Sequence, residues 1–187
     1  MPRRGHQIGS ADHAILGLLA VAPRHGYELA ASFAAGGELA PVCTLGLSQL
    51  YALLHALEEL GYVYSSTSPV SGGPPRKVFH VAYPGAVLFQ RWLERPVDRI
   101  RQVRTDFLLK LYFSQRLADH DTVALLDRQI AASRAYLVEV EAAAATEPPD
   151  SFEALVLSSR VNAAEATLAW LRRQRDRIAA AVERTDG

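Results

Sequence analysis

SQLYALLHALEELGYV, residues 48–63, and SPVSGGPPRK, residues 68–77, decide the fold of this chain. The first segment carries leucines at helical spacing and ends at Gly61, a residue type that commonly terminates a helix. The second is a Gly/Pro-rich loop between residues 62–66 and 77–83, whose β-branched and aromatic side chains favour strands. The sequence therefore predicts an amphipathic helix followed by a β-hairpin with a long loop.

Two shorter helical patterns precede this helix. The first begins near Ser10 or Asp12, either of which can cap a helix, and the second begins at residues 25–28, HGYE. Gly and Pro residues from 36 to 41 then interrupt the chain before the third helix. Three helices and a hairpin constitute a winged helix-turn-helix domain, which we expect over residues 1–83.

Residues 84–187 are predicted to be helical, so the fold class is mainly α with a small β wing. The last helix carries apolar residues at alternating steps of four and three, the spacing of a heptad seam. A long helix with such a seam needs a partner helix, either in the same chain or in a second copy. We expect residues 84–187 to form a helical dimerisation domain. Its seam contacts are Leu157, Val161, Leu168, Leu171 and Ile178.

Composition limits the classes of function. The chain has 187 residues and a formal net charge of zero, so DNA binding would depend on a local basic patch. The single cysteine, Cys43, excludes an internal disulfide and a cysteine-based zinc cluster. No apolar run reaches the roughly 18 residues that span a bilayer, and no secretory signal is visible in residues 1–10. We expect a cytoplasmic protein with no membrane partner.

The sequence contains no recognisable catalytic constellation. Its six histidines are scattered without the HExxH spacing of a metal site, and neither a GxSxG elbow nor a phosphate-binding GxxxxGK[ST] loop occurs. We therefore expect no enzymatic activity, no metal and no cofactor.

The polar face of the third helix is the candidate for reading DNA bases. Ser48, Gln49, Tyr51 and His55 lie on the side opposite the leucines. Gln can bond adenine through two hydrogen bonds, and the other three can reach phosphates or base edges. The alternative interpretation is an ordinary amphipathic helix with a polar outer face.

Arg76 and Lys77 are the candidate basic residues of the wing. No acidic residue occurs between residues 61 and 90, so we expect an unopposed positive tip that lies along the minor groove. The alternative is two ordinary surface charges on a solvated loop. Arg3 and Arg4 are a candidate N-terminal arm toward the DNA backbone, or else part of a frayed terminus.

The two tryptophans, Trp92 and Trp170, are the candidate ligand-binding residues. They are hypothesised to line an apolar cavity between subunits that accepts a flat aromatic ligand. The alternative is that both are packing anchors at a helix interface.

Four blocks of the sequence together resemble the PadR family of bacterial transcriptional regulators. They are ILGLLAVAPRHGYELAASF, SQLYALLHALEELGYV, GGPPRKVFHVAYPGAVLFQRWL and FLLKLYFS, residues 15–33, 48–63, 72–93 and 107–114. The resemblance implies a winged helix-turn-helix domain followed by helices that dimerise two chains. It further implies repression of transcription, with relief by a small molecule, and DNA contacts at Tyr51, its neighbours and the basic wing. The long C-terminal part is similar to that of the larger subfamily.

The sequence thus predicts a homodimeric transcriptional repressor that binds a two-fold operator in double-stranded DNA and is relieved by a small aromatic ligand. Two recognition helices would sit ~34 Å apart to enter successive major-groove faces. The alternative is a winged-helix protein-interaction module that does not bind DNA, which the zero net charge and the uncharged third helix favour.

Overall fold

The computed structural model describes residues 6–70, 73–117 and 120–185. Side chains are described throughout these ranges except at 68–76, the end of the hairpin, and at residue 185. The chain forms two compact units, Met1–Glu94 and Arg95–Gly187.

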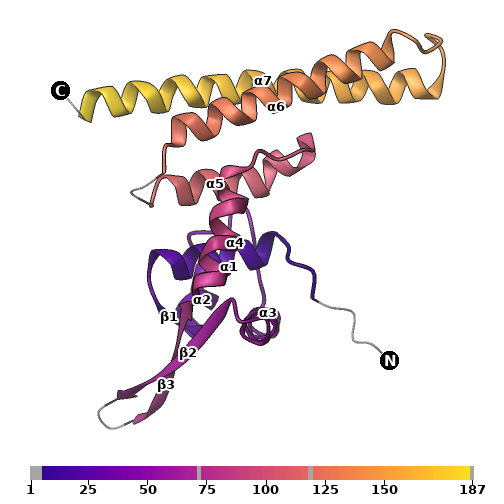
Figure 1. Cartoon of the computed structure of the whole chain (residues 1–187). Coiled ribbons are helices and arrows are strands. Elements are labelled where there is room, and N and C mark those ends of the chain that lie inside the picture. The colour runs from indigo at the N-terminus through magenta and orange to yellow at the C-terminus, as the bar shows by residue number, and fades with distance from the viewer. Residues whose placement is uncertain (1–5, 71–72, 118–119, 186–187) are drawn as a thin grey trace. The chain divides into compact units, whose positions relative to one another are not determined.

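The N-terminal unit contains four helices and a small sheet in its described residues (Figure 1). In chain order the elements are α1 (Ser10–Val21), β1 (Arg24–His25), α2 (Gly26–Phe33), α3 (Leu47–Glu59), β2 (Val63–Val70), β3 (Gly73–Val81) and α4 (Tyr83–Glu94). Helix α1 is the centre of the core, because every residue from 12 to 19 is buried. The three predicted helices and the predicted wing are therefore confirmed.

The start of α1 differs in detail from the sequence prediction. Gly9 is the N-cap, and the carboxylate of Asp12 accepts a hydrogen bond from the Gly9 N–H at 2.8 Å. His6 Nε2 lies 2.8 Å from the other oxygen of the same carboxylate. Asp12 thus stabilises the helix from inside its first turn, where a carboxylate also opposes the positive end of the helix dipole.

The sheet is antiparallel with strand order β1–β3–β2. β2 and β3 pair from Val63↔Val81 to Val70↔Gly73, so the hairpin strands are longer and the loop is shorter than predicted. The residues at 68–70 and 73–76, which looked like loop because of their Gly and Pro content, are strand. β1 was not predicted, since two residues, Arg24 and His25, are too few to show a periodicity.

The boundary between the units lies after α4, whereas the sequence placed it between residues 83 and 84. Pro84 and Gly85 do not separate domains; they form the first turn of α4. Phe89 and Leu93 of that helix are buried and α4 packs on α1, which assigns it to the N-terminal unit.

The C-terminal unit contains the 3₁₀ helix η1 (Ile100–Arg104) and helices α5 (Asp106–Ser114), α6 (Thr122–Ala144) and α7 (Phe152–Thr185). α6 and α7 lie side by side as a long helical hairpin (Figure 1). Each has a side-chain cap: Asp121 Oδ1 accepts from Ala124 N at 2.9 Å, and Ser151 Oγ accepts from Ala154 N at 3.0 Å. The predicted break between these helices, at 146–151, is confirmed.

The core of the C-terminal unit joins η1, α5, α6 and α7. Its main cluster contains Val97, Val103, Phe107, Leu111, Leu125, Leu126 and Leu171. The buried amide of Gln129 in α6 fixes the start of the unit, because it accepts from Val97 N at 2.8 Å and donates to Val97 O at 3.2 Å. Among the described residues, no helix is both long enough and apolar enough to pass through a bilayer.

Candidate nucleic-acid interface

Helix α3 presents a polar face to solvent. Gly46 caps it, and Leu50, Leu54 and Leu57 bury the opposite face in the core. The four predicted base-reading residues are consequently all exposed: Ser48, Gln49, Tyr51 and His55. Gly61, with φ of +71°, ends the helix in the left-handed conformation that glycine adopts without strain.

Tyr51 lies against the start of α2. A Cβ atom built on Gly26 would lie 2.4 Å from the Tyr51 hydroxyl oxygen, so only glycine leaves room for this ring. The residue as a whole remains 39% exposed, so part of the side chain is accessible at the surface. Gly26 therefore positions a residue of α3 from a different helix.

The start of α2 and the residue that caps it add two side chains that the sequence prediction did not assign to this surface. Tyr27 is 75% exposed at the second position of α2. His25 Nδ1 lies 3.3 Å from Lys77 O on β3. The proximity of the HGYE segment to Tyr51 is a tertiary feature that spacing in the sequence does not reveal.

The wing is less positive than predicted. Lys77 Nζ forms an ion pair with Glu58 Oε2 at 2.9 Å, and Ser65 Oγ donates to Glu58 Oε1 at 2.6 Å. The hydrogen bonds from Ser65 and Lys77 hold the pKa of Glu58 below its ordinary value. The expectation of an unopposed positive tip is wrong for Lys77, because the neutralising carboxylate comes from α3 rather than from the hairpin.

Arg76 lies on β3 opposite Ser68, and its side chain is outside the described part of the structure. Arg3 and Arg4 precede the described residues. On the described part of the hairpin, Tyr64 stacks on His80 with ring centroids 4.8 Å apart. The roles of Arg76, Arg3 and Arg4 in binding DNA remain predictions.

Charge in the N-terminal unit is balanced. Residues 1–94 hold six basic and six acidic residues. The basic ones are Arg3, Arg4, Arg24, Arg76, Lys77 and Arg91; the acidic ones are Asp12, Glu28, Glu38, Glu58, Glu59 and Glu94. Arg24 is also paired, with Glu38 at 2.7 Å. Any electrostatic attraction to phosphate must therefore come from a small number of the remaining basic side chains.

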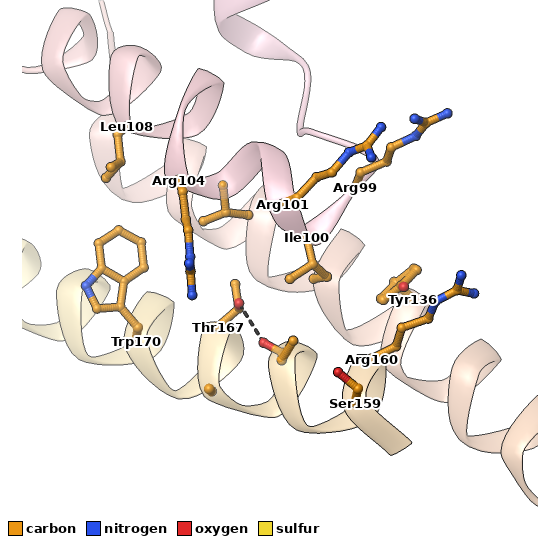
Figure 2. A pocket seen from close by; sticks show the side chains of 13 residues that line it. Arg99, Ile100, Arg101, Arg104, Leu108, Tyr136, Ser159, Arg160, Thr167 and Trp170 are labelled. Carbon is orange, nitrogen blue, oxygen red and sulfur yellow. Dashed lines mark hydrogen bonds between the residues drawn. The ribbon is translucent and has the colours of Figure 1, made fainter. Parts of the chain in front are cut away.

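The two tryptophans belong to different units. Trp92 stacks on His13 inside the N-terminal unit, with ring centroids 4.6 Å apart and planes 9° from parallel, and it is thus a packing residue. Trp170 lines a cavity of about 910 Å³ in the C-terminal unit, formed by η1, α5, α6 and α7 (Figure 2). Trp92 does not line this cavity, so only Trp170 keeps its predicted role as a candidate ligand-binding residue.

The predicted dimer seam of α7 is occupied within one chain. Leu168 and Leu171 are buried, and Leu157, Val161 and Ile178 are half-buried. Helix α6 of the same chain packs along α7 and supplies the partner that the seam requires. The exposed large apolar side chains near the α6–α7 turn are instead Val138, Phe152 and Leu155.

A three-helix core with an antiparallel hairpin after the third helix defines a winged helix-turn-helix domain. The family model described as "Transcriptional regulator PadR-like family" matches residues 15–91, and that described as "Virulence activator alpha C-term" matches residues 103–179. Residues 15–91 belong to the PadR-like family, and the chain is a transcriptional regulator.

Two relatives span nearly the whole chain. The negative transcriptional regulator PadR of Bacillus subtilis is 26% identical over 169 residues, which cover 85% of this chain and 92% of that protein. A probable transcriptional regulator of Mycobacterium tuberculosis is 28% identical over 192 residues, which cover 91% and 96%. The crystal structure of Bacillus subtilis PadR in complex with operator DNA has 24% identity and a TM-score of 0.47, and the match covers 91% of this chain and 99% of that chain.

Proposed function

We propose that this regulator binds operator DNA through α3 and the wing, as a homodimer on a two-fold site. The observation that carries the proposal is the exposed polar face of α3 beside the hairpin. Gln49 reads adenine, Ser48 and His55 reach base edges or phosphates, and Tyr51 donates its hydroxyl to the backbone. Each role requires an exposed side chain with a free donor or acceptor, and all four are exposed.

The wing contributes affinity rather than base preference. Arg76 is the residue we assign to the minor groove, where arginine favours the narrow and negative channel. Lys77 contributes less, because Glu58 already neutralises it at 2.9 Å. Arg3 and Arg4 act as an additional arm toward the DNA backbone.

Dimerisation occurs through the C-terminal unit in this proposal. The exposed apolar residues Val138, Phe152 and Leu155 support it, since exposed apolar patches mark association surfaces. A two-fold pair of chains would set the two α3 helices ~34 Å apart, one turn of the duplex.

The proposed effect is repression, relieved by a small aromatic ligand. The name of the Bacillus subtilis relative, a negative transcriptional regulator, supports repression rather than activation. Trp170 at the cavity of the C-terminal unit supports a ligand with a flat ring. The protein would act in the cytoplasm, where the chromosome of a bacterium lies.

Fluorescence anisotropy with the promoter fragment upstream of the chain's own gene tests the role of α3. The measured preference is the ratio of the affinity for the operator to the affinity for an operator in which one adenine is replaced. Gln49→Ala should lower this ratio about tenfold. Gln90→Ala is the matched control, since Gln90 is an exposed glutamine on α4, away from α3, whose side chain donates to Glu94 Oε1 at 2.7 Å. Equal preferences in the Gln49→Ala variant and the wild type would exclude Gln49 as a reader.

The second candidate function is a winged-helix module that binds a protein instead of DNA. The ion pairs Lys77–Glu58 and Arg24–Glu38 favour it, because they remove positive charge from the surface of the N-terminal unit. The salt dependence of duplex binding separates the two functions. For a DNA-binding domain, the logarithm of the binding constant falls linearly with the logarithm of the salt concentration. A protein-interaction module shows no saturable binding to a duplex at any salt concentration.

A further inference from the structure

The cavity of the C-terminal unit has a charged rim. Four of its thirteen lining residues are arginines, and none of the lining residues is acidic. The arginines are Arg99, Arg101 and Arg104 from the segment around η1 and Arg160 from α7. Four exposed positive charges with no lining carboxylate make this surface attractive to an anion.

Within the described residues, these arginines lack the carboxylate partners that Arg175 of the same unit has. Among the described residues, none of the four forms an ion pair. Arg175, further along α7, pairs with Asp127 at 3.1 Å and with Asp176 at 3.7 Å. The chain therefore neutralises an α7 arginine outside the cavity but leaves the cavity rim positive.

The floor of the cavity is apolar and has an aromatic side chain. Val103, Leu108, Ala163 and Ala166 line it together with the half-buried Trp170. Figure 2 shows Arg104 reaching from η1 toward α7, while Arg99 and Arg101 point away from Trp170 and from α7. The volume of about 910 Å³ lies within the usual range for small-molecule sites.

The hydroxyl of Thr167 does not offer its proton to a ligand, because it already donates within α7. It donates to Ala163 O in the preceding turn at 2.7 Å, the dashed contact in Figure 2. The side chains of α7 beside Trp170 are therefore small and offer apolar surface to the cavity, which suits the edge or face of an aromatic ring. Polar recognition is left to the guanidinium groups.

We propose that this arginine-rimmed cavity binds a phosphorylated aromatic small molecule. The ring lies against Trp170 and the alanines of α7, and the phosphate accepts hydrogen bonds from Arg104. The exposed side chain of Arg101 would turn from the direction it has in Figure 2 to bond the same phosphate. A dianionic phosphate has three acceptor oxygens and can bond more than one guanidinium, whereas one carboxylate is satisfied by a single bidentate arginine. The claim that this ligand is an effector of transcription rests on the proposed function. The claim that the cavity binds the ligand does not.

Trp170 can report binding directly. The chain has two tryptophans, so Trp92→Phe leaves Trp170 as the only indole. We would titrate the full-length Trp92→Phe chain with phenyl phosphate, benzoate, benzyl alcohol and inorganic phosphate at constant ionic strength. The titrations would run near pH ~8, where the phosphate is a dianion. No DNA is present, so the result does not depend on whether the protein binds an operator.

Phenyl phosphate should change the Trp170 emission saturably and bind about tenfold more tightly than benzoate, because it bonds additional guanidinium donors. Benzyl alcohol and inorganic phosphate should each bind more weakly than phenyl phosphate, since each lacks one half of the ligand. Equal affinities for benzoate and phenyl phosphate, or no saturable change with phenyl phosphate, would overturn the proposal.

Two variants locate the site. Arg104→Gln should weaken phenyl phosphate binding about tenfold, whereas Arg173→Gln should not, because it removes the same charge from α7 outside the cavity. Ala166→Phe should block the ring while leaving the thermal melting curve close to that of the parent, since Ala166 is exposed. If Arg104→Gln changes the monomer–dimer equilibrium but not phenyl phosphate binding, the cavity is a contact with a second copy and the proposal is wrong.

Discussion

Glu58 controls the charge of the wing through two short contacts, with Lys77 at 2.9 Å and with Ser65 at 2.6 Å. The hydrogen bonds from Ser65 and then Lys77 lower the pKa of Glu58, so the carboxylate is ionised at neutral pH. Lys77 is half-exposed, and its charge would be available to phosphate if Glu58 did not face it.

Glu58→Gln should therefore strengthen binding to any duplex and steepen the salt dependence by about one unit, the signature of one more phosphate contact. Anisotropy titrations over a series of salt concentrations measure the slope. Glu59→Gln is the control, because Glu59 faces His55 at 3.7 Å rather than the wing. Identical slopes in both variants would show that the Lys77–Glu58 pair does not limit DNA binding.

Gly26 carries a second prediction, because its Cα supports the ring of Tyr51. In Gly26→Ala the new methyl group would lie 2.4 Å from the Tyr51 hydroxyl oxygen, so the ring must move. We expect the free energy of unfolding to fall by about 1–3 kcal/mol and DNA binding to weaken. Urea unfolding and anisotropy measure the two effects.

Gly46→Ala provides the comparison, since a Cβ at Gly46 meets no atom within 4 Å and its φ is −73°. The double variant Gly26→Ala/Tyr51→Ala should recover stability relative to Gly26→Ala alone. A Gly26→Ala variant as stable as Gly46→Ala would mean that Tyr51 does not rest on Gly26.

Lys110 is the buried cation of the C-terminal unit, and it donates a hydrogen bond to Arg95 O. Burial lowers its pKa to about 8, and Arg95 acts in the same direction, while Asp106 and Asp98 partly oppose this. Because the folded pKa lies below the unfolded value of 10.5, the unfolded chain binds more protons between these two pH values.

Stability should accordingly rise with pH between about 8 and 10.5, by about 2 kcal/mol relative to a Lys110→Met variant, which lacks the titrating group. Urea unfolding of both proteins at several pH values measures the difference. A constant difference across this pH window would show that Lys110 is solvated in the folded state.

At the scale of elements, periodicity was sufficient for the helices and insufficient for the short strands and the unit boundary. The leucine pattern of α3 and the break at 146–151 depend on local spacing, and both are present in the structure. β1 has two residues, and its existence depends on pairing with β3, more than fifty residues away. The first turn of α4 contains Pro84 and Gly85, residue types that usually interrupt helices, although Pro is compatible with a first turn.

In the candidate site, too, features set by local spacing could be predicted, and contacts between distant segments could not. Exposure of Ser48, Gln49, Tyr51 and His55 followed from their positions opposite the leucines. The Lys77–Glu58 pair and the Gly26–Tyr51 contact join segments that are distant in sequence, so counting charges within the hairpin could not reveal them. The same limitation applied to Trp92 and Trp170, whose surroundings are set by tertiary packing.

The seam of α7 gives a prediction at the scale of a helix pair. Leu171 is fully buried in the core of the C-terminal unit, so Leu171→Ala should lower the free energy of unfolding by about 2–5 kcal/mol. Leu155→Ala, on the same helix but 67% exposed, should change stability much less. Thermal unfolding distinguishes the two variants.

Sedimentation of the same two variants separates folding from assembly. Leu155→Ala should raise the concentration at which dimers form, because its side chain belongs to the proposed association surface. A strong loss of stability in Leu155→Ala, or none in Leu171→Ala, would contradict the assignment of the seam to packing within one chain.

At the scale of the whole molecule, the formal charge is zero in each unit. The chain has twenty basic and twenty acidic residues, and six of each lie in residues 1–94, so residues 95–187 hold fourteen of each. Overall electrostatic attraction therefore does not bring the protein to DNA. In the proposed function the binding free energy comes from the shape and hydrogen bonds of two α3 helices presented together, with a small number of phosphate contacts. A shallow salt dependence and a strong dependence on dimerisation follow from this arrangement.

The most direct test is a stoichiometric anisotropy titration of the full-length protein against the promoter fragment upstream of its own gene, with an unrelated duplex as competitor. We predict a saturable complex with two chains per site that survives excess competitor and is lost when Gln49 and Tyr51 are both replaced by alanine. Binding to both duplexes with equal affinity, or a complex that persists in the double variant, would contradict recognition through α3.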